Sequence, residues 1–251
     1  MLRHPARLAR AAARLAAVAA ALSAAAAPAA PPDFGPMETY QLAIIRRGPA
    51  WTSERNATVD SLQAGHMANI RRMAEAGKLV AAGPFAAPGD LRGLYFFRTD
   101  SADAARLAAE DPAVRAGRLI LELHPLLTRA GIGEPYRELK ARGDRRADSM
   151  TVRTFGFLRA APGRDTIPAA HIAALQEPHL WHLRRGMSAG RLLLAGPLLS
   201  NGPRRGIFVF EGDTTAARAF FADDPLVRRG ALEVEVLPWF ASAHLIAPLP
   251  D

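Results

Sequence analysis

Apolar residues along the chain follow two alternating periods, and the resulting series of elements occurs twice. Apolar runs of about four to eight residues predict strands, and apolar residues recurring every three or four positions predict helices. In the first half these patterns predict a strand, a helix, two strands, a helix and a strand: residues 38–45, 59–73, 79–85, 93–97, 102–109 and 119–123. The second half repeats this order: residues 151–158, 172–183, 192–199, 206–210, 215–222 and 232–237.

The two series are copies of one another. Shifting the chain by 113 residues aligns residues 37–125 with residues 150–238 without a gap, and about 30 of the 89 aligned positions are identical. Self-similarity at a fixed offset indicates that one structural unit is present twice. We therefore predict two domains, residues 37–125 and 150–240. They are joined by a polar linker at residues 126–149, whose middle (135–141) is expected to be helical.

The order of elements within each copy predicts the fold. A β-α-β-β-α-β unit forms a four-stranded antiparallel sheet with both helices on one face, the ferredoxin-like α+β fold. The other face of such a sheet is apolar and has to be covered. We therefore predict that the two sheets pack face to face, as an intramolecular dimeric α/β barrel. The pattern leaves open whether this internal pseudo-dimer associates further.

The first 32 residues differ in composition from the rest of the chain. Four arginines lie between positions 3 and 14, an Ala-rich apolar run follows at residues 15–22, and small residues lead to Pro31-Pro32. This order is typical of a secretory signal peptide, so residues 1–32 are predicted to direct export to the periplasm or the medium. A disordered leader, a transit peptide and an uncleaved anchor are alternatives. The apolar run is shorter than the about 20 residues of a membrane-spanning helix.

Composition narrows the classes of function. The formal net charge is +8, with 49% hydrophobic and 22% charged residues, as in ordinary globular proteins. Part of the charge lies in the leader, and the other basic residues are not interleaved with aromatic ones. We therefore expect neither nucleic-acid binding nor membrane contact once the leader is removed. The absence of cysteine excludes disulfides, thiol nucleophiles and Cys-ligated metal centres.

A series of short motifs recurs at matched positions in the two copies. In the first copy a His precedes an Arg pair, a Gly-Pro pair and the phrase Asp-Pro-x-Val-Arg-x-Gly: His66, Arg71-Arg72, Gly83-Pro84 and Asp111–Gly117. In the second copy they are His179, Arg184-Arg185, Gly196-Pro197 and Asp224–Gly230, followed by Leu237-Pro238-Trp239. The order and content of these motifs resemble the YCII-related (YciI-like) family.

The resemblance implies a fold, an activity and a site. It implies the dimeric α/β barrel, similarity to small lactone-handling and dehydrochlorinating enzymes, and an active site made of a His-Asp pair. Carried over to this chain, the pairs are His66 with Asp111 and His179 with Asp224. Imidazole titrates near neutral pH and can move a proton. A carboxylate on its other nitrogen orients the ring and stabilises the imidazolium.

Other residues of the motifs are candidates for substrate binding. Gly83-Pro84 and Gly196-Pro197 could allow a ligand close to the backbone, and Arg71 and Arg184 could pair with a substrate carboxylate. No Ser or Cys recurs at the motifs to act as a nucleophile, so proton abstraction or elimination is the favoured reaction class. No cofactor and no metal are expected.

Each candidate also has a purely structural interpretation. The two histidines lie within apolar helical stripes, where a His is often a core residue. Asp before Pro is an ordinary helix start, and the Gly-Pro pairs could serve backbone geometry. His179 and His182 have metal-ligand spacing, but no carboxylate completes the set. Pro178 precedes His179, so the second-copy helix is expected to begin or kink there.

We therefore predict an exported tandem protein whose His-Asp pairs act on a small acidic or cyclic organic compound by proton transfer, as in isomerases or lyases. The alternative is a non-catalytic module that binds a small molecule or a partner.

Overall fold

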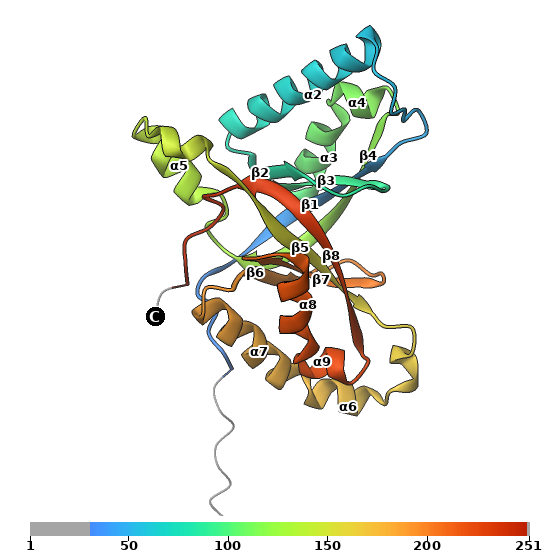
Figure 1. The fold of residues 1–251 in the computed structure, drawn as a ribbon, viewed down its shortest axis with the longest axis vertical. Helices are drawn as coiled ribbons and strands as arrows, with labels where there is room; N and C mark the ends of the chain where they lie inside the picture. Colours follow the sequence, from blue (N-terminus) through green and yellow to red (C-terminus); the bar gives the residue numbers. More distant parts are fainter. Residues whose placement is uncertain (1–30, 250–251) are drawn as a thin grey trace, which may run out of the picture. The chain divides into compact units, whose positions relative to one another are not determined.

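Each repeat folds into a four-stranded antiparallel sheet with its helices on one face (Figure 1). The computed structural model describes residues 31–249, so the predicted signal peptide at residues 1–32 lies almost entirely outside the described residues. The first repeat contains β1 (Met37–Arg47), α2 (Ala57–Glu75), β2 (Leu79–Pro84), β3 (Leu91–Phe97), α3 (Ser101–Ala109), α4 (Pro112–Arg115) and β4 (Leu119–Arg129). The second contains β5 (Met150–Ala160), η3 (Arg164–Thr166), α6 (Ala169–Ala174), α7 (Gln176–Ser188), β6 (Leu192–Pro197), β7 (Arg204–Phe210), α8 (Thr214–Ala222), α9 (Pro225–Arg228) and β8 (Leu232–Ser242).

The strand orders are β2-β3-β1-β4 in the first sheet and β6-β7-β5-β8 in the second. They are the same order at equivalent positions, so the α+β, ferredoxin-like prediction is confirmed for both repeats. Residues from Pro32 onward, which include both sheets, belong to one structural unit. Among the residues that the structure describes, no helix is long and apolar enough to cross a membrane.

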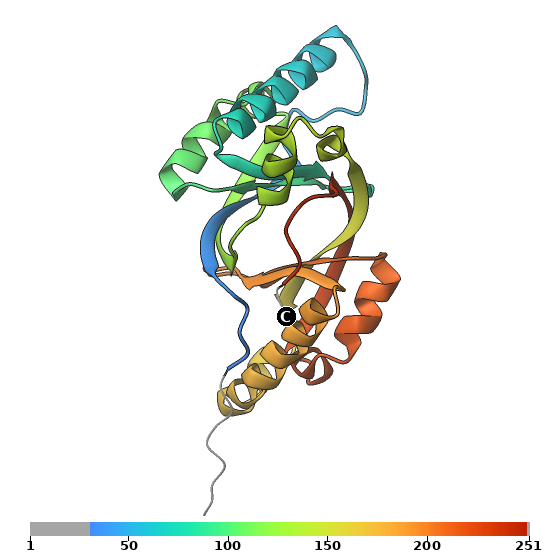
Figure 2. The same ribbon diagram turned by 90° about the vertical axis from the view of Figure 1, so that its left-hand side faces the viewer.

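The two sheets pack face to face, with the helices on the outside (Figure 2). The core between them draws fully buried aromatic side chains from both repeats: Tyr40, Phe96, Phe155, Phe157 and Trp239. Each sheet also packs its outer face against its own helices, which gives one further apolar core per repeat. The burial of aromatic area on the inner faces explains why neither sheet is left bare.

The edges of the two sheets meet, and this corrects two predicted strand ends. Strands β4 and β8 do not stop before Pro125 and Pro238 but continue through them to Arg129 and Ser242. Both are edge strands of their own sheet, where a residue without an N–H group is tolerated. The carbonyl groups of these prolines accept hydrogen bonds from the other repeat, from Leu199 N at 2.8 Å and Ala86 N at 2.9 Å respectively.

The linker contains the predicted helix. Helix α5 (Glu134–Ala141) and the 3₁₀ helix η2 (Arg145–Asp148) fill the connection between β4 and β5. The first long helix is continuous in repeat one, whereas in repeat two it is divided at Leu175 into α6 and α7. Pro178 lies in the first turn of α7, where a missing N–H group costs no helical hydrogen bond.

Replacing Gly156 by Ala should destabilise the protein by about 1–3 kcal/mol through overpacking. A Cβ atom at this position would lie 2.0 Å from Phe208 Cζ, and that ring is fully buried against Phe221, with centroids 4.1 Å apart. Urea unfolding would measure the loss. Gly163→Ala is the control, since an added Cβ there meets nothing within 4 Å. Equal stability of the two variants would contradict the prediction.

Candidate functional site

Two His-Asp pairs link the long helix of each repeat to the short helix that follows. In the first, His66 Nδ1 on α2 lies 2.7 Å from Asp111 Oδ2. In the second, His179 Nδ1 on α7 lies 2.6 Å from Asp224 Oδ2. Both carboxylates are fully buried. The pairs named from sequence are therefore in direct contact, although their partners are 45 residues apart.

The same carboxylates also cap helices. Asp111 Oδ1 accepts a hydrogen bond from Ala113 N at 2.8 Å, at the start of α4. Asp224 Oδ1 accepts one from Leu226 N at 2.9 Å, at the start of α9. Each Asp thus uses one oxygen for the cap and the other for its His. The capping and pairing interpretations are not alternatives in this fold.

The charges around the first pair set its protonation. Burial opposes ionisation of Asp111, but the hydrogen bonds from His66 and from the Ala113 N–H outweigh it and hold the pKa of Asp111 below its ordinary value. Its ionised carboxylate accepts the Nδ1–H of His66, which leaves Nε2 as the acceptor in the neutral ring. This tautomer is assigned from the hydrogen-bond partners.

Tyr95 on β3 faces the other nitrogen of the same imidazole. Its hydroxyl oxygen lies 3.3 Å from His66 Nε2. Burial, and then the charge of Asp111, raise the pKa of Tyr95, so its hydroxyl stays protonated and can donate to Nε2. Tyr95, His66 and Asp111 therefore form a continuous hydrogen-bonded chain from β3 to α4.

A cavity of about 660 Å³ opens beside the hydrogen-bonded residues Tyr95, His66 and Asp111. It is lined by α2, β2 and β3 of the first repeat, together with side chains from α5 and from the end of the second repeat, among them Tyr136, Arg137, Phe240 and His244. Its volume lies within the range of small-molecule sites, about 300–1,000 Å³. His66 lines the cavity and its side chain is 12% exposed.

The second repeat differs around its pair. The position aligned with Tyr95 is Phe208, which carries no hydroxyl. The chain's own ends cover this repeat: Phe34 and Leu249 pack against its helix-side core, and Arg184 Nε on α7 donates to Asp33 O at 2.6 Å. Arg129 is buried there and donates to the carbonyls of Leu193 and Ala247. The asymmetry selects the first repeat as the candidate site.

Only some of the residues proposed from sequence for substrate binding line this cavity. Gly83 and Pro84 line the cavity, but an added Cβ at Gly83 would lie 2.1 Å from Phe240 O. Gly196 approaches Leu127 O in the same way. The two glycines therefore allow the repeats to come together at their edges, which is a packing role.

The structure does not bring Arg71 or Arg184, predicted to bind a substrate carboxylate, to this cavity. Arg71 is exposed and is not among the residues that line it. Five helical positions separate it from His66, which turns it about 140° away from the imidazole. Arg184 is in the second repeat and binds the backbone of Asp33. Pro197 is exposed as well.

Sequence reasoning missed several residues that line the cavity: Trp51, Arg92, Tyr95, Arg137 and His244. Tyr95 could have been noticed, because it is polar where the aligned Phe208 is apolar. Arg92 is on β3, and the others come from a loop, from the linker and from beyond the second repeat. Their approach to His66 is a consequence of the barrel.

His179 and His182, which have metal-ligand spacing in the sequence, make packing and hydrogen-bond contacts instead. His182 packs against the ring of Phe220, with centroids 4.2 Å apart, and burial lowers its pKa. Within residues 31–249 no group of three or more His, Asp or Glu residues is arranged to hold a metal ion.

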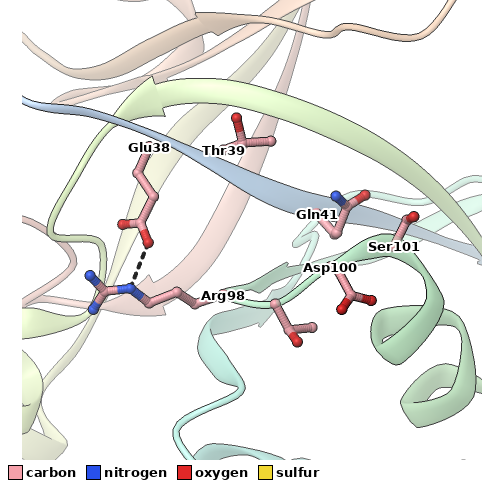
Figure 3. Close-up of a pocket in the computed structure, with 7 residues that line it drawn as sticks. Glu38, Thr39, Gln41, Arg98, Asp100 and Ser101 are labelled. Carbon is pink, nitrogen blue, oxygen red and sulfur yellow. Dashed lines mark hydrogen bonds and ion pairs between the residues drawn. The ribbon is translucent and has the colours of Figure 1, made fainter.

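A second hollow, of about 480 Å³, lies at the start of α3 (Figure 3). Its ionic groups satisfy one another. Arg98 Nε lies 2.7 Å from Glu38 Oε1 (Figure 3), and Asp100 caps α3 by accepting from Asp103 N. It contains no His and no hydrogen-bonded acid–base pair, so the chemistry is assigned to the first cavity.

Comparison with known proteins first defines the class of fold. No protein-family model matches the chain, and no curated protein matches it. Solved structures do share its architecture, the two-domain ferredoxin-like α/β fold of chlorite dismutases. At the identities found, this likeness concerns the fold alone.

Three solved structures are similar to this chain at low sequence identity. An arginine-to-lysine mutant of chlorite dismutase from Candidatus Nitrospira defluvii is 10% identical, with a TM-score of 0.51 over 81% of this chain and 90% of that one. An arginine-to-alanine mutant of the same enzyme is 12% identical, with a TM-score of 0.50 and the same coverage. A heme-binding protein from Thermus thermophilus is 16% identical over 85% and 94% of the chains, with a TM-score of 0.45.

These findings correct the family resemblance. The assignment to the YCII-related family is wrong, since no family model matches and the similar solved structures include chlorite dismutases. The motifs that suggested this family have structural roles in the split βαβ unit. They are an Asp-Pro helix start with its cap, a Gly that ends a helix and a Gly at a close backbone approach.

Proposed function

We propose that the protein is an enzyme that moves a proton on a small organic compound bound in the cavity of the first repeat. The observation that carries this proposal is the chain from Tyr95 through His66 to Asp111, whose basic nitrogen borders a largely apolar cavity. A base must lie within hydrogen-bond reach of the proton that it abstracts. Among Tyr95, His66 and Asp111, the atom that can reach a proton of a bound compound is Nε2 of His66.

His66, Asp111 and Tyr95 have separate roles in the proposed reaction. His66 Nε2 takes a proton from a carbon next to a carbonyl group, and the C–H electron pair moves into the carbonyl, which becomes an enolate. Asp111 stabilises the imidazolium that forms. The hydroxyl of Tyr95, released from Nε2, donates to the enolate oxygen. Return of the proton to another carbon completes an isomerisation, and loss of a leaving group completes an elimination.

Haem, the ligand named for the Thermus protein, fits this cavity less well. Two histidines line it, His66 and His244. The Nε2 atom of His66 already faces the buried Tyr95 hydroxyl, and that of His244 lies 2.9 Å from Arg146 O. An iron at His244 Nε2 would have to displace the Arg146 carbonyl, and an iron at His66 Nε2 would occupy the atom that the proposed proton transfer needs. When the wild type is titrated with hemin, its Soret band should therefore shift no more than that of the His66→Gln variant.

The test of the proposal does not need a named substrate. Purified protein is incubated in D₂O with pools of small lactones, hydroxy acids and keto acids, and proton NMR follows the loss of C–H signals next to the carbonyl groups. Catalysed exchange of one compound would support the proposal. A compound that binds without exchange would favour the alternative, a non-catalytic small-molecule-binding module. Export by residues 1–32 is part of the proposal and is tested by cell fractionation.

Asp111→Asn should lower this exchange by about tenfold or more while keeping the α4 cap, because Asn caps helices as well as Asp. With its oxygen on Ala113 N–H, the amide presents an N–H group to His66 and forces the tautomer whose Nε2 is not a base. Stability should also change with pH. The native pKa of Asp111 lies below the unfolded value of 3.8, so its contribution is present above that pH and is lost as pH falls through the native pKa.

Urea unfolding at neutral and acidic pH measures this contribution. The wild type should lose more stability on acidification than Asp111→Asn. Asp111→Ala, which also removes the cap, should cost about 1 kcal/mol more than Asn at neutral pH. An Asn variant with unchanged exchange would contradict the role given to the carboxylate.

A further inference from the structure

Three arginines surround Trp51, a residue that lines the same cavity. The guanidinium carbons of Arg47, Arg92 and Arg118 lie 5.1, 4.9 and 4.4 Å from the centre of its ring. Trp51 and Arg92 also line the cavity that contains His66. The three come from the end of β1, from β3 and from the residue before β4, so the sheet gathers them from distant parts of the sequence.

These charges have no carboxylate partner among residues 31–249. None of the three arginines takes part in an ion pair with a carboxylate. Asp90, just before β3, and Glu122, on β4, both bind Arg46 at 2.6 Å. In addition, Nη1 of Arg118 is buried without a hydrogen-bond partner. A buried polar group of this kind is costly unless a ligand satisfies it.

Repulsion within the cluster contributes to the lowered pKa of Arg92. Burial, and then the charges of Arg47 and Arg118, lower the pKa of Arg92. Stacking on Trp51 offsets part of this cost. Three like charges held together without a counterion are typical of a site that binds an anion, and guanidinium groups match the two oxygens of a carboxylate or phosphate.

We propose that Arg47, Arg92 and Arg118 form an oxyanion-binding site that holds the carboxylate or phosphate group of a small organic anion. That this anion belongs to the substrate of His66 rests on the proposed function, whereas anion binding itself does not. The site would anchor the charged end of the compound at the rim and leave its apolar part in the cavity beside the imidazole. It defines the substrate as an acid and replaces the role expected of Arg71.

The experiment measures anion binding by calorimetry and thermal shift on the full chain at constant ionic strength. The probes are phthalate and phenyl phosphate, with neutral dimethyl phthalate as the uncharged analogue. Both anions should raise Tm, and the diester should not. The Arg92→Gln variant should weaken binding by about tenfold or more, the loss expected for one charge-assisted hydrogen bond.

The second repeat offers a matched control. Arg205 is aligned with Arg92 but is exposed, and Trp51 is replaced by Arg164. Arg205→Gln changes the net charge equally and should leave binding unchanged. Without ligand, Arg92→Gln should be at least as stable as the wild type, because it relieves repulsion. Equal weakening by both variants, no binding of either anion, or a lower Tm of ligand-free Arg92→Gln would overturn the proposal.

Failure of this site and failure of the proposed function can be told apart. His66→Gln should still bind phthalate, because it does not belong to the arginine cluster. Anion binding without proton exchange would retain the oxyanion site and reject the catalytic role. Proton exchange that Arg92→Gln leaves unchanged, together with no binding of either anion, would retain the catalytic role and reject the oxyanion site.

Discussion

His66→Gln should lower proton exchange at the cavity by about 10²–10⁴-fold, the usual contribution of a positioned general base. Gln fills nearly the same space and can still bond Asp111, but its amide has no basic nitrogen near neutral pH. The nitrogen that is lost is the one that faces Tyr95 and the cavity. The measurement is the rate of C–H loss in D₂O for the compound found in the screen.

The matched variant is His179→Gln, which makes the same replacement in the second His-Asp pair, where the carboxylate is also buried. Its exchange rate should equal that of the wild type, because Phe208 replaces Tyr95 and the chain ends cover that side. Equal losses in both variants would place the chemistry in both repeats or indicate a shared structural effect. Circular dichroism of each variant distinguishes the two.

Trp239→Ala should destabilise the protein by about 3–5 kcal/mol, the range for removing a large buried aromatic side chain. Trp239 is fully buried between the sheets and packs against Phe96 of the first repeat and Phe155 of the second. Its indole N–H donates to Gly83 O at 3.0 Å, across the two repeats. The substitution therefore opens a cavity and leaves a buried carbonyl without its partner.

Urea unfolding measures this loss, and Trp181→Ala is the control. Trp181 lies on α7 and is 36% exposed, so its removal should change the free energy of unfolding by about 0.5 kcal/mol or less. Since Trp239 joins both repeats, the unfolding transition of Trp239→Ala should remain a single one at lower urea. A cost below about 1 kcal/mol would contradict the role of Trp239 as the centre of the barrel.

Local pattern was sufficient for the repeated unit. The periods of apolar residues predicted every strand and long helix, because the period is set by which face of an element is buried. The recurrent His and Asp residues were also found from sequence. Their spacing follows from the unit itself, since Asp111 and Asp224 begin short helices that pack beside α2 and α7.

Local pattern was not sufficient at the edges and at the rim. Strands β4 and β8 continue through proline because the other repeat supplies their hydrogen-bond partners, and those partners are distant in sequence. The same motif residues also suggested a family that the comparisons contradict. A helix cap, a glycine at a close approach and a glycine at a helix end are required by backbone geometry. Unrelated families with this fold can share that geometry.

By itself, the sequence determined the duplication, the β-α-β-β-α-β unit and the pairing of two sheets, since these follow from local periodicity and from the need to cover apolar faces. Only the tertiary structure decided which His borders a cavity and which arginines can meet an anion. Barrel closure brings α5 and the end of β8 over the first repeat, and the chain ends over the second. Two nearly identical His-Asp pairs therefore acquire different surroundings, because a side chain's chemistry depends on neighbours that are distant along the chain.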